Sequence, residues 1–311
     1  MMEKPKENFS WAYSIFTLIG LTILGFIIVV FASVFSSSDF ESLEGNVAVI
    51  PIKGVIMADD DNAFFEDIVS STDTVELIEK AADNENIKAI ILEINSPGGS
   101  AVASEEIANA VKKTNKTTVA WIREVGASGG YWIASSSDYI VANRLSITGS
   151  IGVIASYLEF SGFLDRYNIT YERLVAGKYK DIGSPFKDMT PEERMVFQQS
   201  LDEMRDYFAS EVAKNRNINK KDIDKIANGM FFTGAQAKTL GLVDELGGKG
   251  EAIAYIEKKE GITAELVDYE TEKGFFDLIS SAMSKQSFFV GKGIGSSVLD
   301  RKAVSSVIVN T

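Results

Sequence analysis

Apolar segments that end in glycine-rich turns and lead directly into helical segments constrain the fold of this chain more than any other feature. Residues 88–94 form a mostly apolar, β-branched run, as expected of a strand buried in a parallel sheet. A turn at 95–100 follows, and helical spacing then covers 101–113. The same order returns with a strand at 117–122 and a helix at 129–135. Strands and helices that alternate across short loops predict an α/β fold.

The rest of the chain divides into one long folded region with shorter flanks. We expect a linker at 36–44, a single domain at 45–268 and a peripheral, mobile tail at 269–311. Thr190 and Glu193 have the spacing of a capping box, which predicts that a helix begins there. The other expected elements are strands at 47–56, 139–142 and 263–268, and helices at 73–82 (with Asp73 as its N-cap), 190–215, 220–228 and 233–240.

An apolar stretch at 13–35 has no charged residue and is long enough to cross a bilayer as a helix, which takes about 20 residues. Lys4 and Lys6 precede it, whereas only acidic charges follow it before Lys53. This asymmetry predicts a single-pass anchor in the cell membrane, with residues 1–12 in the cytoplasm and the folded domain outside. A cleaved signal peptide is the alternative, but its apolar region would span only about 7–15 residues.

The composition narrows the classes of partner. The 311 residues carry a net charge of −13, which argues against nucleic acid, because phosphate binding needs a basic surface. The chain has no cysteine, so disulfides and thiolate metal sites are excluded, and it has no histidine, which disfavours zinc. We therefore expect no metal and no other cofactor.

Ser128 lies in the sequence GASGG, which fits the G-x-S-x-G nucleophile elbow of serine hydrolases. A serine hydroxyl needs a base to take its proton, and without histidine that base must be a lysine or a carboxylate. Because Ser128 would open a helix, the N–H group of Gly129 is expected to stabilise an oxyanion. Gly98 and Gly99, in the turn after the preceding strand, are candidates for further donors.

Six segments, taken in order, resemble the signatures of the signal peptide peptidase A (protease IV) family. The similarity spans about residues 47–268, includes the preceding apolar stretch, and matches the half-length, single-repeat form. The segments are INSPGG at 94–99, GASGGYWIA at 126–134, TGSIGV at 148–153, GKYKDIGSP at 177–185, FTGAQA at 232–237 and LVDELG at 242–247.

This resemblance implies a Clp protease/crotonase-like fold of repeated ββα units behind one N-terminal transmembrane helix. It implies a membrane-anchored serine endopeptidase that degrades remnant signal peptides and other short membrane-associated peptides outside the cytoplasmic membrane. Members of the family assemble into rings or domes, in which the catalytic dyad forms between neighbouring repeats. A half-length chain would therefore form a homo-oligomer and complete its dyad between neighbouring subunits.

The resemblance also assigns roles to individual residues. Ser128 is the expected nucleophile, Lys180 the base, and Ser150 the residue that orients the lysine. Lys178 is the main competitor, because it would lie on the same face of an extended segment. A base must be neutral, whereas lysine in water titrates near about pH 10.4. We therefore expect assembly to bury Lys180 among apolar groups, with Asp181 pointing away.

Three other functions compete with this one. A membrane serine protease of the stomatin-partner type would usually carry several C-terminal spans, and no second apolar run of about 20 residues exists. A crotonase-like acyl-CoA enzyme would use the same fold without a paired serine and lysine. A non-catalytic scaffold would keep the fold in order to bind peptides.

Overall fold

The computed structural model describes residues 15–25, 28, 45–59 and 68–270, and the chain divides into two units, 1–44 and 45–311. In the first unit, residues 15–25 and 28 are helical and exposed. No helix in these described ranges is both long and apolar enough to span a membrane. The expected anchor at 13–35 is only partly described, the linker at 36–44 lies outside the described residues, and so does the tail beyond residue 270.

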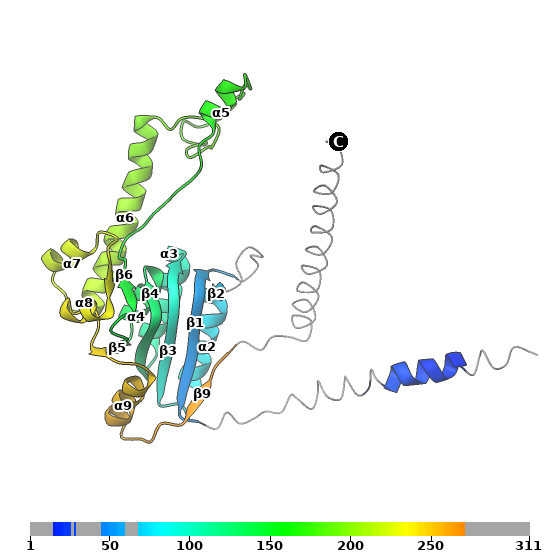
Figure 1. The fold of residues 1–311 in the computed structure, drawn as a ribbon, viewed down its shortest axis with the longest axis vertical. Coiled ribbons are helices and arrows are strands. Elements are labelled where there is room, and N and C mark those ends of the chain that lie inside the picture. Colours follow the sequence, from blue (N-terminus) through cyan, green and yellow to red (C-terminus); the bar gives the residue numbers. More distant parts are fainter. Residues whose placement is uncertain (1–14, 26–27, 29–44, 60–67, 271–311) are drawn as a thin grey trace, which may run out of the picture. The chain divides into compact units, whose positions relative to one another are not determined.

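The second unit alternates strands and helices, as the sequence pattern predicts (Figure 1). Its elements are, in chain order, β1 (Val47–Met57), β2 (Ile68–Ser70), α2 (Ser71–Asp83), β3 (Ala89–Gly99), α3 (Ala101–Lys113), β4 (Thr117–Ala127), α4 (Gly129–Ser135), β5 (Tyr139–Ala142), β6 (Ile147–Gly149), α5 (Ser161–Arg166), α6 (Pro191–Asn215), α7 (Lys220–Ile226), β7 (Phe231–Thr233), α8 (Gly234–Thr239), β8 (Glu245–Leu246), α9 (Lys249–Glu260) and β9 (Leu266–Asp268).

One mostly parallel sheet joins all the strands. Its main path runs β2-β1-β3-β4-β5-β8, and β9 pairs with the N-terminal end of β1. β6 lies parallel to the last residues of β4, and it pairs antiparallel with β7 on its other side. The expectation of an α/β fold is therefore confirmed, and the carboxyl ends of β3 and β4 meet at the same edge of the sheet, where parallel α/β folds place their sites.

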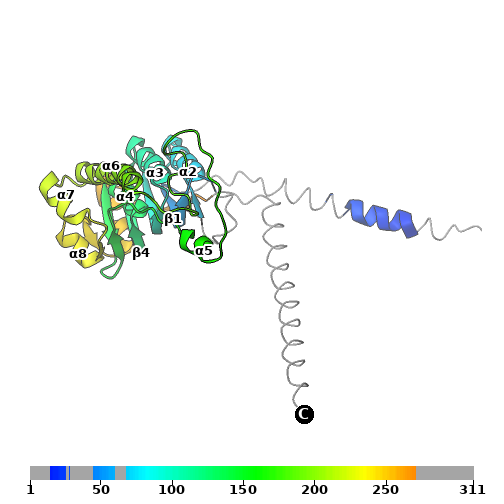
Figure 2. The same ribbon diagram turned by 90° about the horizontal axis from the view of Figure 1, so that it is seen from above.

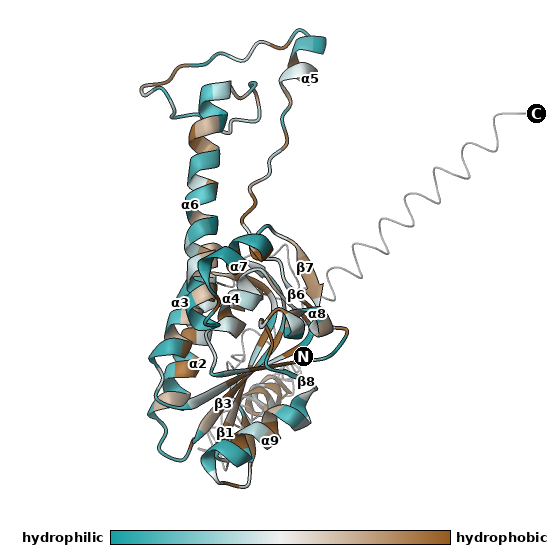
Figure 3. Ribbon diagram, turned by 90° about the vertical axis from the view of Figure 1, so that its left-hand side faces the viewer, coloured by the Kyte–Doolittle hydropathy of each residue, from teal (hydrophilic) through white to brown (hydrophobic). Residues whose placement is uncertain are grey.

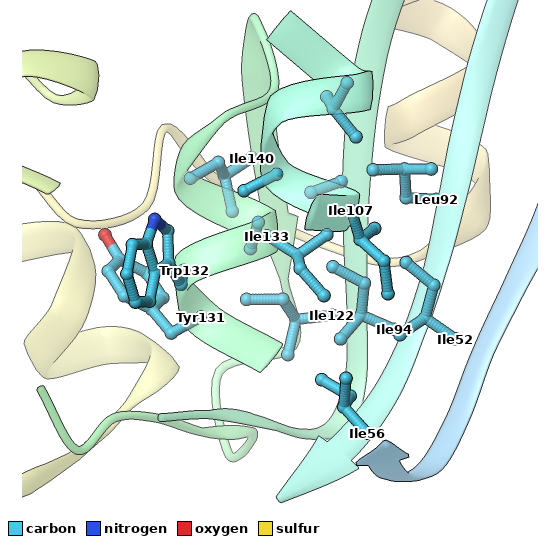
Figure 4. Packing of buried hydrophobic residues seen from close by; sticks show 14 of the residues in the cluster. Ile52, Ile56, Leu92, Ile94, Ile107, Ile122, Tyr131, Trp132, Ile133 and Ile140 are labelled. Carbon is cyan, nitrogen blue, oxygen red and sulfur yellow. The ribbon is translucent and has the colours of Figure 1, made fainter. Parts of the chain in front are cut away.

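Both faces of the sheet are buried, which explains why its strands are almost continuously apolar. Successive side chains of a strand point to opposite faces, so Ile50 and Ile52 of β1 pack with α2, α3 and α4, while Val47 and Val49 pack with α9. Figure 2 shows α2, α3, α4 and α6 in a row on one side of the strands. Figure 4 shows the isoleucines of β1, β3 and β4 in contact with α3 and α4 on this face.

Several expected boundaries were right and several were wrong. The helices α3 and α4 and the strand β5 have the expected bounds, and α6 begins at the capping box of Thr190 and Glu193. The N-cap of α2 is Ser70, not Asp73, because the Ser70 hydroxyl accepts the hydrogen bond from the Asp73 N–H group.

β3 and β4 are longer than the pattern indicates. They extend to Gly99 and Ala127, past the expected ends at 94 and 122, because strand pairing with β1 and β6 continues through the glycines. The turn expected at 95–100 is therefore largely strand. Tertiary pairing overrides the low β-propensity of glycine there. The sequence pattern also missed α5, α9 and the short strands β2, β6, β7 and β8.

Residues 153–190, which we call the arm, connect β6 to α6. Most of the arm is exposed, and α5 is its one helix among the described residues. Figures 1 and 3 show α5 and its connection to α6 beyond the N-terminal end of α6. The C-terminal half of α6 packs on α4, where the rings of Trp132 and Phe208 stack with centroids 4.6 Å apart.

Candidate active site

Ser128 occupies a sharp turn between the end of β4 and the start of α4. Its backbone has φ 53° and ψ −123°, a conformation that side-chain-bearing residues rarely adopt. Hydrogen bonds hold it in place: the Ser128 N–H donates to Gly149 O, and Ser128 O accepts from the N–H groups of Tyr131 and Trp132, each at 2.9 Å. A strained serine at a strand-to-helix turn is the geometry of a nucleophile elbow.

Glycines allow other backbone segments to approach this turn closely. Gly98 has φ +99°, and a Cβ on Gly98 would lie 2.8 Å from the Cβ of Ser128 and 2.7 Å from the nitrogen of Gly129. A Cβ on Gly129 would lie 2.1 Å from the hydroxyl of Ser104 in α3. Side chains at these two positions would therefore displace the elbow, which explains the glycines physically.

The three expected oxyanion donors differ in their hydrogen bonding. The Gly129 N–H has no acceptor among the described residues, as expected at the first position of a helix. The Gly98 N–H is instead donated to the buried hydroxyl of Ser96 at 3.1 Å. The nitrogen of Gly99 lies 3.4 Å from the position of a Cβ on Gly129, so it lies close to the elbow.

Ser150 lies next to Ser128 across the β4–β6 ladder. Ala127 pairs with Gly149, so Ser128 and Ser150 follow a paired position on adjacent strands. Ser150 also has a positive φ, 52°, and its N–H donates to Met230 O at 2.9 Å. Its hydroxyl makes a long contact of 3.4 Å with Gly229 O. The structure therefore brings together Ser128, Ser150 and the three glycines.

The two lysines of the arm have different surroundings. Lys178 contacts both carboxylate oxygens of Glu192 at 2.6 Å, and this contact raises the pKa of Lys178. Lys180 is exposed, and its amine has no hydrogen bond or ion pair with any described residue. The neighbouring Asp181 is bound through its carboxylate to Arg173, which lowers the pKa of Asp181.

The structure does not bring Lys180 to Ser128 within one chain. The segment that carries Lys180 contacts the start of α6 at Glu192, whereas α4, which begins beside Ser128, contacts α6 at Phe208. These two positions are 16 residues apart, or about 24 Å along a helix axis. The Ser128 hydroxyl has no hydrogen-bond partner among the described residues.

Sequence reasoning missed Ser96 and Gly149, which support the site through Gly98 and Ser128. The sequence contains one signal for Ser96, because the hydroxyl of a serine in a turn can accept a hydrogen bond from the N–H group of the residue two positions later. Nothing local identifies Gly149, because its contact with Ser128 depends on β6 lying beside β4.

The α/β fold and the serine elbow together are those of a serine hydrolase. The chain belongs to peptidase family S49, whose family model matches residues 110–263, a range that includes the elbow and the arm.

Similar proteins agree with this assignment. A candidate protease of Methanocaldococcus jannaschii is 35% identical over 72% of this chain and 71% of its own length. A candidate signal peptide peptidase SppA of Enterococcus faecium is 32% identical over 73% of this chain and 67% of its own length. Protease 4 of Haemophilus influenzae is 32% identical over 68% of this chain, but the match covers only 34% of that longer protein.

Proposed function

We propose that this peptidase cleaves peptides with a dyad of Ser128 and Lys180, completed between neighbouring subunits of a homo-oligomer. The observation that carries the proposal is the separation of the two residues: a strained, unpartnered serine at the start of α4, which contacts α6 at Phe208, and an unpartnered lysine in the arm, which contacts α6 at Glu192. Within the described part of one chain, neither the Ser128 hydroxyl nor the Lys180 amine has a hydrogen-bond partner, which supports a dyad completed by a second subunit.

Lys180 suits the role of base better than Lys178. Lys178 is held by Glu192, which favours its ammonium form, and an ammonium group cannot take a proton from serine. Asp181 is bound to Arg173, so its carboxylate is engaged elsewhere. Burial of the arm against a second subunit would desolvate Lys180 without adding a carboxylate, and desolvation favours the neutral amine.

The mechanism follows acyl transfer. Neutral Lys180 takes the hydroxyl proton as Ser128 Oγ attacks the scissile carbonyl carbon, and Ser150 orients the amine. The N–H groups of Gly129 and Gly99 stabilise the oxyanion of the tetrahedral intermediate. Protonated Lys180 then gives its proton to the leaving amine, and water hydrolyses the acyl-enzyme. Activity should therefore rise toward alkaline pH.

The setting of the reaction follows from the flanks of the domain. We propose that residues 13–35 anchor the chain in the cell membrane, with the N-terminus in the cytoplasm and the catalytic domain outside. Substrates would be remnant signal peptides and other short membrane-associated peptides, bound in extended form along an exposed strand edge. The domain would be of the Clp protease/crotonase kind.

A mixing experiment tests the intersubunit dyad. Full-length Ser128→Ala and Lys180→Ala chains should each be inactive alone, but mixed assemblies should contain interfaces where an intact Ser128 meets an intact Lys180. Co-expression should therefore restore part of the turnover of a short apolar fluorogenic peptide. Co-expression of two Ser128→Ala chains with different tags is the matched control and should restore nothing.

Other results would redirect the proposal. Mixed assemblies that stay inactive, while both variants fold and assemble, would place the dyad within one chain. A wild-type assembly that cleaves no peptide, and whose Ser128 is not labelled by a serine-directed phosphonate, would favour the peptide-binding scaffold.

A further inference from the structure

Ser96 is a fully buried serine of β3 whose hydroxyl joins two backbone groups. It donates to Gly54 O at 2.6 Å and accepts from the Gly98 N–H at 3.1 Å. Both glycines have positive φ, +113° for Gly54 and +99° for Gly98. One hydroxyl therefore connects a kink in β1 with the turn that lies against Ser128.

The kink is a bulge in the pairing of β1 with β3. Lys53 pairs with Asn95, and the next pair is Val55 with Gly98. β3 thus has one residue more than β1 between these two pairs, and Ser96 falls within this irregular stretch. A bulge leaves ladder groups without their regular partners.

The Ser96 hydroxyl bridges two backbone groups that face each other in the ladder beside the bulge. Beyond the bulge the ladder is regular, and the Ser100 N–H donates to Ile56 O at 2.8 Å. Two residues earlier on both strands, the equivalent bond of a parallel ladder would join the Gly98 N–H to Gly54 O. In this structure the hydroxyl of Ser96 bonds to both of these groups.

This arrangement determines which N–H groups face the nucleophile. N–H groups of successive residues in a strand point to opposite sides, so the Gly99 N–H points away from β1 when those of Gly98 and Ser100 point toward it. The nitrogen of Gly99 accordingly lies 3.4 Å from the position of a Cβ on Gly129. The Gly98 N–H is directed into the buried hydroxyl and away from the reaction centre.

Ser96 also contacts the elbow helix through its backbone. A Cβ on Gly130 would lie 2.8 Å from Ser96 O and 3.4 Å from Ser96 Cβ. The residue therefore contacts α4 two positions after Ser128 while its hydroxyl holds the turn on the other side.

We propose that Ser96 is a positioning residue for the oxyanion hole. Its hydroxyl engages the Gly98 N–H and thereby keeps the Gly99 N–H directed, with that of Gly129, at the developing oxyanion. The inference rests on the proposed chemistry of Ser128 and deepens it, because it states which donors act and what holds them. Without the hydroxyl, the Gly98 N–H would lose its side-chain acceptor and Gly54 O its side-chain donor, so the peptide groups of the turn would be free to reorient.

The test compares Ser96→Ala with Ser71→Ala in the full-length protein. Ser71 is also fully buried and donates a hydrogen bond, to Glu106 at 2.6 Å, but it lies in α2 and not at the elbow. Ser96→Ala should lower kcat by about 10- to 100-fold, since loss of one oxyanion donor costs about 100- to 1,000-fold and displacement costs less. KM should change little, and a peptide aldehyde, which forms a tetrahedral adduct, should bind more weakly by a similar factor. Ser96→Thr, which keeps the hydroxyl, should recover much of the loss.

Hydrogen exchange provides a readout that does not depend on turnover. The Gly98 amide should exchange at least about tenfold faster in Ser96→Ala than in wild type, and it should be unchanged in Ser71→Ala. Equal losses of kcat in the two alanine variants, or unchanged aldehyde affinity and Gly98 exchange in Ser96→Ala, would overturn the inference. Full activity of Ser128→Ala would instead overturn the proposed function, and the exchange rates would still decide whether Ser96 holds Gly98.

Discussion

Gly98 packs directly against Ser128, because a Cβ on Gly98 would lie only 2.8 Å from the Cβ of Ser128. Gly98 lies near the end of β3, and Ser128 directly follows the end of the neighbouring strand β4. The closeness of this contact places the turn of one βα unit beside the nucleophile of the next. Four predictions follow from this contact and from the ion pairs of the arm and the core.

Substitution of Gly98 by alanine should abolish activity. The new Cβ would collide with Ser128 and would also be strained at φ +99°, so both the elbow and the oxyanion hole would shift. We expect at least about a 100-fold loss of kcat/KM. Gly241→Ala is the matched control, because Gly241 has φ +76° but open space around its Cβ position. It should be destabilised by about 1 kcal/mol and remain active. Peptide turnover and urea unfolding measure the two effects, and equal activity losses would contradict the steric argument.

Lys180→Ala should be inactive, whereas Lys178→Ala should keep turnover within a few-fold of wild type. The reason is that Glu192 raises the pKa of Lys178 and so keeps it charged, while Lys180 has no carboxylate partner among the described residues. Because the two members of a dyad act as a unit, removal of the lysine should lower kcat by about 1,000-fold or more. Turnover of the fluorogenic peptide by assembled protein is the measurement. An active Lys180→Ala beside an inactive Lys178→Ala would assign the base to Lys178.

Asp244→Ala should destabilise the domain by about 3 kcal/mol. The Asp244 carboxylate accepts hydrogen bonds from Arg216, at 2.7 Å, and from the Ile140 N–H, at 2.8 Å. The Arg216 side chain is only 8% exposed, so loss of the Asp244 carboxylate would leave the nearly buried guanidinium charge without its ion-pair partner. Asp206→Ala, which removes a surface ion pair with Arg205, should leave the urea midpoint nearly unchanged. Similar midpoints for the two variants would show that the Asp244 pair contributes little.

The arm should loosen in acid. Arg173 lowers the pKa of Asp181 below its ordinary value of 3.8. The Asp181 carboxylate therefore binds a proton more weakly in the ordered arm than in the disordered arm. The stabilisation is therefore complete above the ordinary pKa and is lost as the pH falls through the lowered one. The rate at which an acid protease cuts the arm, followed from about pH 5 to pH 2, measures this. Asp181→Asn should be cut faster than wild type at the upper end of this range, and the two rates should converge at the lower end. Parallel rates at every pH would exclude a role for this ion pair.

Much of the site could be predicted from the sequence because its chemistry depends on residue types at short spacing. Ser128, Gly129 and the helix that they open follow from one five-residue pattern, and the absence of histidine restricts the base to a lysine or a carboxylate. The boundaries of α3, α4 and α6 also follow from local signals, since helix caps and helical periodicity act within a few residues.

The bulge at Ser96 could not be predicted, because it depends on pairing between strands. Most of the turn expected at 95–100 is strand because it pairs with β1, and the Gly98 N–H donates a hydrogen bond to the Ser96 side chain. The strands β6 and β7 were missed for the same reason, since three residues carry too little periodicity to indicate a strand.

By itself, the sequence determined the alternation of strands and helices, the nucleophile elbow and the motifs that identify the peptidase family, because each depends on neighbouring residues. Only the tertiary structure decided that β6 places Ser150 beside Ser128, that the Gly98 N–H is engaged by Ser96, and that the segment with Lys180 contacts α6 at Glu192 while α4 contacts it at Phe208. These relationships join residues that are distant in the chain, and they exist only after the sheet has set the register of its strands.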